Sequence, residues 1–108
     1  MIRVGLWRDR DDRPRRLVVS GHANRGPHGQ DIVCAAASAL VETLALGLRE
    51  VVHEDFRGQV DVGHADLWFD EALSSEARAI VETIVRGFMD LAQSESDAVR
   101  FVEHRGGA

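Results

Sequence analysis

The sequence predicts an α+β fold in which a mostly antiparallel four-stranded sheet packs against two helices, in the order β-β-α-β-α-β. Two observations predict this fold. Segments of alternating apolar residues, typical of strands, interleave with two segments whose apolar residues recur at helical spacing. The strands and helices do not alternate strictly, which favours a mostly antiparallel sheet. The chain has 108 residues, the size of one domain, so we expect residues 1–108 to form a single domain.

The first two strands precede a glycine-containing loop. Ile2–Arg8 alternates between apolar and other residues, as a half-buried strand does. The polar run Asp9–Arg16 contains a proline and is typical of a hairpin connection. Leu17–Ser20 is a short second strand with β-branched residues at its centre. Gly21–Gln30 contains three glycines and Pro27 and is therefore expected to be a loop.

The second part of the chain contains two helices. Asp31 is expected to begin a long helix that ends near Val52, and its first half is apolar almost all round, as in a helix buried on most sides. Val60–Phe69 resembles a third strand. Ser74 is a suitable N-cap for a second helix that ends near Ala92. Ala98–Glu103 is expected to be the last strand.

The composition excludes several classes of protein. With 44% hydrophobic and 29% charged residues, the chain is typical of a folded globular protein. The net charge of -5 argues against broad, sequence-independent binding of nucleic acid. The single cysteine excludes an intramolecular disulfide and a cysteine-rich zinc site. No stretch is expected to span a membrane or to act as a signal peptide, so a cytoplasmic location is expected.

The chemistry is expected at the start of the first helix, where Cys34 falls in the first turn and Asp31 is the expected N-cap. Free backbone N–H groups and the positive end of the helix dipole favour a thiolate at this position. The charge of the Asp31 carboxylate opposes this effect. A nearby cation would favour the thiolate, and the loop contains two histidines, His22 and His28.

His22 directly follows the second strand and precedes Cys34 by twelve residues. The loop between them is long enough to fold back and bring the imidazole to the sulfur. A Cys–His pair is the minimum for covalent acyl transfer, because the imidazole takes the thiol proton and returns it to the leaving amine. Backbone N–H groups at the start of the helix are candidate oxyanion-hole donors.

Each of these residues also has a simpler interpretation. Cys34 alone would be read as a small buried apolar residue, and a loop histidine as solvated. His22, His28 and Cys34 are spaced evenly by six, but they lack a fourth ligand and the short spacing of zinc sites, so no metal is expected. Ser38 lies one turn after Cys34, where its hydroxyl would bond to the Cys34 carbonyl or to the loop, or simply permit close packing. Four aromatic residues are expected in the core (Trp7, Trp68, Phe69 and Phe88), and the other three histidines are expected on the surface (His53, His64 and His104).

The stretches Gly21–Ala23, Gly29–Ala36 and Ser38–Leu40 together resemble the signature of the ribosomal-processing cysteine protease family, Prp. The order of elements and the length are similar too. The resemblance implies a homodimeric peptidase, without a cofactor, that removes a short N-terminal extension from a bacterial large-subunit ribosomal protein. It also implies residue roles: His22 matches the acid/base histidine, Cys34 the nucleophile, and Asp31 and Ser38 positions that shape the site.

The middle of the loop departs from the family pattern. It lacks the aromatic or aliphatic character typical of many members, and Pro27 restricts its backbone. His28 is a second imidazole near the thiol, so the choice of His22 rests on the family match. We expect the loop to cover a bound peptide and to close when the peptide binds. The expected substrate loop comprises Asn24, Arg25, Gly26, Pro27, His28 and Gly29.

Two other functions stay open from the sequence alone. One is a non-catalytic, dimeric, ribosome-associated binding module that keeps the motif for packing. The other is a different thiol-dependent hydrolase or transferase. A thiol at a helix N-terminus together with a histidine at a strand end favours an enzyme. The expected partners are a ribosomal-protein precursor and a second copy of the chain, with no direct contact to nucleic acid or membrane.

Overall fold

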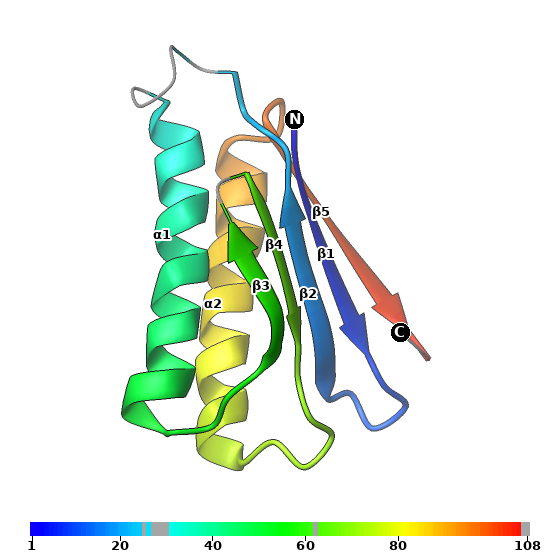
Figure 1. Cartoon of the computed structure of the whole chain (residues 1–108). Helices are drawn as coiled ribbons and strands as arrows, with labels where there is room; N and C mark the ends of the chain where they lie inside the picture. The colour runs from blue at the N-terminus through cyan, green and yellow to red at the C-terminus, as the bar shows by residue number, and fades with distance from the viewer. Residues whose placement is uncertain (25, 27–30, 62, 107–108) are drawn as a thin grey trace.

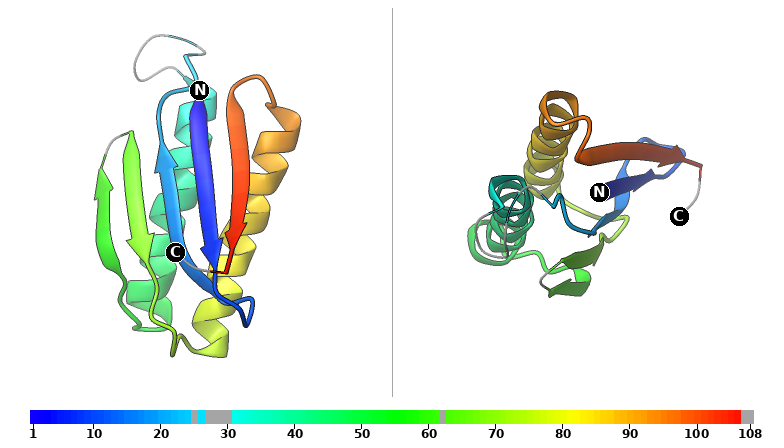
Figure 2. Two further views of the ribbon diagram at one scale, coloured as in Figure 1. Left: turned by 90° about the vertical axis from the view of Figure 1, so that its right-hand side faces the viewer. Right: turned by 90° about the horizontal axis from the view of Figure 1, so that it is seen from above.

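The computed structural model describes residues 1–24, 26, 31–61 and 63–106. A five-stranded mixed sheet packs through one face against two helices, and Figure 1 shows the two helices side by side on that face. In Figure 2 (left) the strands lie next to one another with both helices behind them. The strands and helices are β1 (Ile2–Arg8), β2 (Pro14–Ser20), α1 (Ile32–Leu46), the π-helical turn η1 (Gly47–Val51), β3 (Arg57–Asp61), β4 (His64–Trp68), α2 (Ser75–Ser94) and β5 (Val99–Arg105).

The predicted four-stranded sheet was wrong by one strand. The segment interpreted as a single strand contains β4 and the end of β3, which form an antiparallel hairpin that pairs Asp61 with His64. Gly63 permits this tight turn, because its φ of 76° lies in the left-handed region that favours glycine. The residues on both sides of the turn are strand-forming, so the turn itself was not recognised.

The strand order is β3-β4-β2-β1-β5, and the sheet is mixed. β1 pairs with β2, β2 with β4 and β4 with β3 in antiparallel fashion, as expected. β5 pairs with β1 in parallel. The α+β class with two helices is therefore confirmed, and the full order is β-β-α-β-β-α-β.

The core lies between the sheet and the helices. Alternate residues of each central strand point to the helices, as the strand period of two requires. The second helix begins at its predicted cap, because the Ser74 hydroxyl accepts a hydrogen bond from the Ala77 N–H. Buried core residues include Ile2, Val4, Leu6, Leu17, Val19 and Leu67 from the sheet, Val33, Ala37, Val41 and Leu44 from α1, Val81, Val85 and Phe88 from α2, and Phe69.

The opposite face of the sheet carries the two tryptophans, which were expected in the core. Trp7 and Trp68 are only half-buried there. The Arg16 guanidinium lies over both rings, 5.0 Å and 4.3 Å from their centroids, and His104 stacks on Trp7 at 4.5 Å. Cation–π and stacking contacts thus cover apolar rings that no helix reaches.

The first helix and the π-helical turn that follows it form a long apolar segment. Ile32–Val51 is 20 residues long with a mean hydropathy of 1.6, the length and composition of a membrane span. The expectation that no stretch reaches these values was therefore wrong. The inner side of this helix packs on the sheet, as in a core helix, while Ile32 and Leu46 are exposed on its outer side.

Candidate active site

Cys34 lies in the first turn of α1, as predicted, and its side chain is half-buried. Asp31 is the N-cap, with extended backbone, and its Oδ1 accepts hydrogen bonds from the N–H groups of Val33 and Cys34 at 3.0 Å each. This is the usual arrangement of a capping aspartate. The cap fixes the direction in which the first turn presents the Cys34 sulfur.

The Cys34 sulfur accepts a hydrogen bond from the backbone N–H of Ala23 at 3.2 Å. Ala23 is buried and directly follows His22. This hydrogen bond links the sulfur to the residue that directly follows His22. Since Val33 and Cys34 already donate to Asp31, these two N–H groups are not the free oxyanion-hole donors that the sequence indicated.

His22 follows the end of β2, and the structure brings it to Cys34. The chain turns at Gly21, between the end of β2 and His22; the φ of Gly21 is 96° and its N–H donates to the Gly63 carbonyl oxygen at 3.1 Å. A side chain at Gly21 would collide with the backbone of Met1. The conformational freedom of glycine is therefore needed here to turn the imidazole out of the strand and toward α1.

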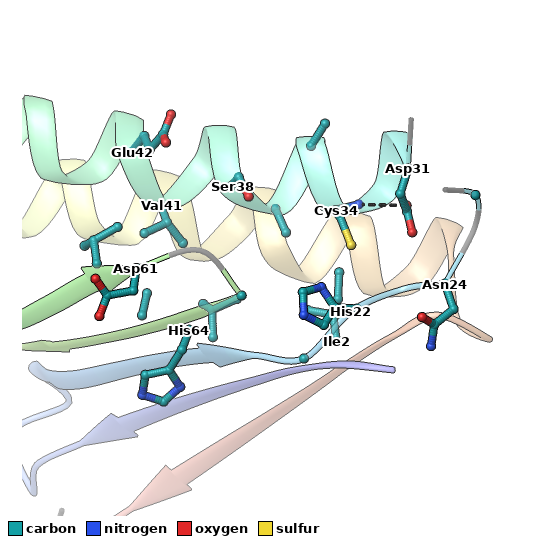
Figure 3. Close-up of a pocket in the computed structure, with 18 residues that line it drawn as sticks. Ile2, His22, Asn24, Asp31, Cys34, Ser38, Val41, Glu42, Asp61 and His64 are labelled. Atoms are coloured by element: carbon teal, nitrogen blue, oxygen red, sulfur yellow. Dashed lines mark hydrogen bonds between the residues drawn. The ribbon is translucent and has the colours of Figure 1, made fainter. Parts of the chain in front are cut away.

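A pocket of about 540 Å³ separates α1 from the end of β2 and the β3–β4 hairpin. Figure 3 shows the Cys34 sulfur directed from α1 toward this space, with the His22 ring on the opposite side. The N-terminal end of α1, the end of β2 and the β3–β4 turn lie at the same end of the molecule (Figure 1). Of the predicted site residues, those lining the pocket are His22, Asn24, Gly26, Asp31, Cys34 and Ser38.

Other pocket residues were missed from the sequence. Asp61, Gly63 and His64 form the wall that the β3–β4 hairpin contributes, and Glu42 lies two turns beyond Cys34 on α1. His64 is among the residues at the pocket, but its side chain is exposed, as expected, and points away from α1 (Figure 3). Gly63 was the signal available in the sequence. Interpreted as a turn residue, it would have predicted the β3–β4 hairpin and so placed this wall beside the loop.

Part of the predicted substrate loop is not covered by the structure. Arg25, Pro27, His28 and Gly29 lie outside the described residues, and with them the expected closure of the loop. The zinc alternative also depends on His28. Within the described ranges, no group of three or more His, Cys, Asp or Glu side chains is arranged to hold a metal ion. Ser38 is exposed and lines the pocket. Within the described ranges, its hydroxyl does not make the expected hydrogen bond to the Cys34 carbonyl.

Comparison with known proteins identifies the family. A family model described as cysteine protease Prp matches residues 1–100. The chain belongs to the Prp family of cysteine proteases. The ribosomal processing cysteine protease Prp of Bacillus subtilis is 30% identical over 93 residues, which cover 82% of this chain and 81% of that protein. Membership of the Prp family makes this chain a cysteine protease, and Cys34 is its single cysteine.

Two solved Prp structures share the fold. Prp from Staphylococcus aureus in complex with a covalently linked product peptide superimposes with a TM-score of 0.83 at 22% identity, covering 95% of this chain and 99% of that chain. The same protein with a substrate peptide gives a TM-score of 0.77 at 21% identity, with the same coverage. The five-stranded sheet and two helices are therefore the Prp fold throughout the chain.

Proposed function

We propose that this protein is an endopeptidase that removes a short N-terminal extension from a bacterial large-subunit ribosomal protein, with Cys34 as nucleophile and His22 as acid/base. The observation that carries the proposal is the location of both side chains in one pocket, with the sulfur at the capped start of a helix. The relatives named ribosomal processing cysteine proteases support the substrate class.

The chemistry needs these two groups in sequence. The His22 imidazole accepts the Cys34 thiol proton, and the thiolate attacks the carbonyl carbon of the scissile peptide bond. When the tetrahedral intermediate collapses, its C–N bond breaks and the imidazolium donates the proton to the leaving amine, which leaves a thioester on Cys34. Water, deprotonated by the imidazole, then attacks the thioester and releases the acid product and the thiol.

Asp31 and Ser38 support this chemistry from α1. Asp31 holds the first turn in place through two backbone hydrogen bonds, so it positions the sulfur without contacting it. Ser38 faces the pocket one turn after Cys34, where its hydroxyl can contact a bound peptide. The Ala23 N–H donates a hydrogen bond to the Cys34 sulfur at 3.2 Å and so helps to hold the sulfur beside the residue that follows His22.

The pocket is larger than a Cys–His pair requires, which supports a peptide substrate. It continues from Cys34 past Ser38 to Val41 and Glu42 on α1, with β3 and β4 on the other side. A groove between a helix and an edge hairpin suits an extended chain, whose backbone can bond to a strand while alternate side chains enter pockets. Asn24 and Gly26, the described residues of the predicted substrate loop, line the same pocket as Cys34 and would contact the substrate there.

We further propose that the protein acts as a homodimer in the cytoplasm. The outer side of α1 supports a self-association surface, because Ile32 and Leu46 are 77% and 55% exposed. Large exposed apolar residues on a small protein are a common feature of protein interfaces. Analytical ultracentrifugation of the wild type and of Leu46→Glu tests this proposal, with a dimer expected for the wild type only.

The substrate is tested with the host's ribosomal protein. The precursor is incubated with the wild-type enzyme, and the N-terminus of the product is determined by mass spectrometry. The expected result is one new N-terminus within the first residues of the precursor. Binding of the precursor without cleavage would instead favour a non-catalytic, ribosome-associated module. If the enzyme leaves the precursor intact but cleaves unrelated thioesters or peptides, it is a different thiol-dependent hydrolase.

A further inference from the structure

The His22 imidazole lies directly on the turn between β3 and β4. A Cβ atom built on Gly63 would stand 2.9 Å from Cε1 and 3.0 Å from Nε2 of the His22 ring. Real Cβ atoms do not come this close to a neighbouring atom, so the ring occupies the space that any side chain at position 63 would need. The turn backbone is therefore the surface on which the ring rests.

The same turn also holds the backbone that carries the histidine. The Gly63 carbonyl oxygen accepts a hydrogen bond from the N–H of Gly21, the residue before His22, at 3.1 Å. One glycine thus leaves the space beside its α-carbon to the ring and bonds the preceding peptide through its carbonyl. The hydrogen bond restricts the place where the His22 side chain begins, and the missing side chain leaves room for the ring.

No side chain in the described part of the chain hydrogen-bonds to the His22 ring. Many enzymes with a nucleophile and a histidine use a third, hydrogen-bonding side chain to orient the imidazole. Here the available orienting contact is packing against a backbone. A ring that is held by packing moves when the packing surface changes, which makes the residue at position 63 directly relevant to proton transfer.

We infer that Gly63 is a positioning residue for His22, and that the β3–β4 turn sets the orientation of the imidazole relative to the Cys34 sulfur. The inference rests on the proposed acid/base role of His22. Gly63 touches neither the sulfur nor the expected position of the scissile bond; it acts through the ring. A side chain at position 63 would push the ring away from the turn and change its distance to the sulfur.

Gly63→Ala tests the inference, with Gly106→Ala as a matched control. Both glycines have positive φ, 76° and 86°, so both substitutions introduce the same type of backbone strain. A Cβ at Gly106 meets no heavy atom within 4 Å, whereas a Cβ at Gly63 meets the His22 ring. Any difference between the variants beyond strain therefore reports on contact with the ring.

Three properties are measured for each variant: kcat and KM with a peptide substrate, the rate of Cys34 alkylation by iodoacetamide as a function of pH, and the thermal unfolding midpoint. Gly63→Ala is expected to lower kcat by about 10- to 100-fold, the scale of an ångström-sized misplacement of a catalytic group, with little change in KM. The pH profile of alkylation is expected to shift. Gly106→Ala is expected to match the wild type in kcat and in the alkylation profile.

A double variant separates action through His22 from a general effect on the site. If Gly63 acts through the ring, Gly63→Ala lowers kcat in the wild type but causes no further loss in the His22→Ala background. Should Gly63→Ala fold poorly, Gly63→Asn carries the same Cβ while tolerating positive φ better, and it is measured in the same way.

The outcomes distinguish this inference from the proposed function. Equal kcat and equal alkylation profiles for the wild type and a folded Gly63 variant, with His22→Ala nearly inactive, overturn the positioning role and leave the dyad intact. The positioning role is also overturned if Gly63→Ala lowers kcat by the same factor in the His22→Ala background as in the wild type. Full activity of His22→Ala overturns the dyad and the inference together.

Discussion

At the residue scale, three hydrogen bonds hold the nucleophile and its helical turn in place. The Asp31 carboxylate accepts two backbone hydrogen bonds at the start of α1, and the Ala23 N–H donates to the Cys34 sulfur. Asp31 precedes Cys34 by three residues, and Ala23 directly follows His22. The cap was predictable because its residue type and its place before a helical segment are local features. The Ala23 contact was not, because it depends on how the loop folds back.

Asp31→Ala is expected to lower the free energy of unfolding by about 1 kcal/mol, because the N–H groups of Val33 and Cys34 lose their acceptor. Asp31→Asn keeps an acceptor oxygen and is expected to cost clearly less. Urea denaturation of the wild type and both variants measures these values. An equal loss for alanine and asparagine would show that the negative charge, and not the cap, is what stabilises the first turn.

At the element scale, Arg8 ties three elements together. Its guanidinium is buried at the end of β1 and bonds to both oxygens of Glu82 on α2, at 2.7 Å and 2.8 Å, and to Glu103 on β5 at 2.6 Å. The parallel pairing of β5 with β1 brings Glu103 within reach. These hydrogen bonds, opposed by burial, raise the pKa of Arg8 above its ordinary value, so it stays charged.

Arg8→Ala is expected to reduce the free energy of unfolding by about 2–3 kcal/mol, because Glu82 and Glu103 lose their shortest hydrogen bonds and keep the more exposed Arg78 and Arg105 as partners. We expect a smaller loss of stability than for a fully buried ion pair, because the side chains of both carboxylates are partly exposed, at 28% and 32%. Arg13→Ala is the control, since the Arg13–Asp11 pair is exposed and is expected to contribute less than about 0.5 kcal/mol. Similar values for the two variants in urea denaturation would contradict a structural role of Arg8.

The elements also show where sequence reasoning stopped. β1 and the start of α1 were predicted correctly, because period and capping are local signals. The β3–β4 hairpin was missed because the residues on both sides of Gly63 suit a strand, and the parallel position of β5 depends on packing between distant segments. The missed hairpin explains the missed wall of the pocket, including His64.

At the scale of the whole molecule, carboxylates paired with arginines link stability to pH. Hydrogen bonding to Arg8 lowers the pKa of Glu103, and hydrogen bonding to Arg16 lowers the pKa of Asp66, in each case opposed by burial. A carboxylate whose pKa is lower in the folded than in the unfolded state contributes stability above its unfolded pKa and loses it as the pH falls through the folded pKa.

The free energy of unfolding is therefore expected to decrease as the pH falls below the ordinary values of 4.5 for Glu103 and 3.8 for Asp66. Urea denaturation at several pH values measures the slope. In Arg8→Ala the slope is expected to be shallower, because Glu103 loses the hydrogen bond that lowers its pKa most and keeps only the weaker effect of Arg105. The same slope in both proteins would show that this pair does not contribute to acid sensitivity.

The sequence predicted that Cys34 and His22 lie near each other, but it did not predict the shape of the pocket that they line. Cys34 and His22 line one pocket, which their twelve-residue separation made plausible. The groove that surrounds them is built from α1, β2, β3 and β4, so its walls exist only in the folded chain. Residue types and spacing therefore indicated which two side chains lie together, while the walls of the pocket and the position of the His22 ring beside Gly63 required the structure.

The choice between the two loop histidines is tested by alanine substitution. His22→Ala is expected to lower kcat by about 100-fold or more, the usual effect of losing a positioned general acid/base. His28→Ala is expected to have a milder effect through the shape of the loop. Steady-state kinetics of both variants on one peptide substrate decide this, and a reversed order would move the acid/base role to His28.

The most direct test of the Cys34 nucleophile is a comparison of the wild type with Cys34→Ala on the same substrate. The small side chain removed is half-buried, so the variant is expected to stay folded, which its circular dichroism spectrum verifies. Intact-mass spectrometry of the reaction is expected to show cleavage and a thioester adduct on Cys34 with the wild type, and neither with Cys34→Ala. Cleavage by a folded Cys34→Ala variant at the wild-type rate would contradict the cysteine peptidase mechanism.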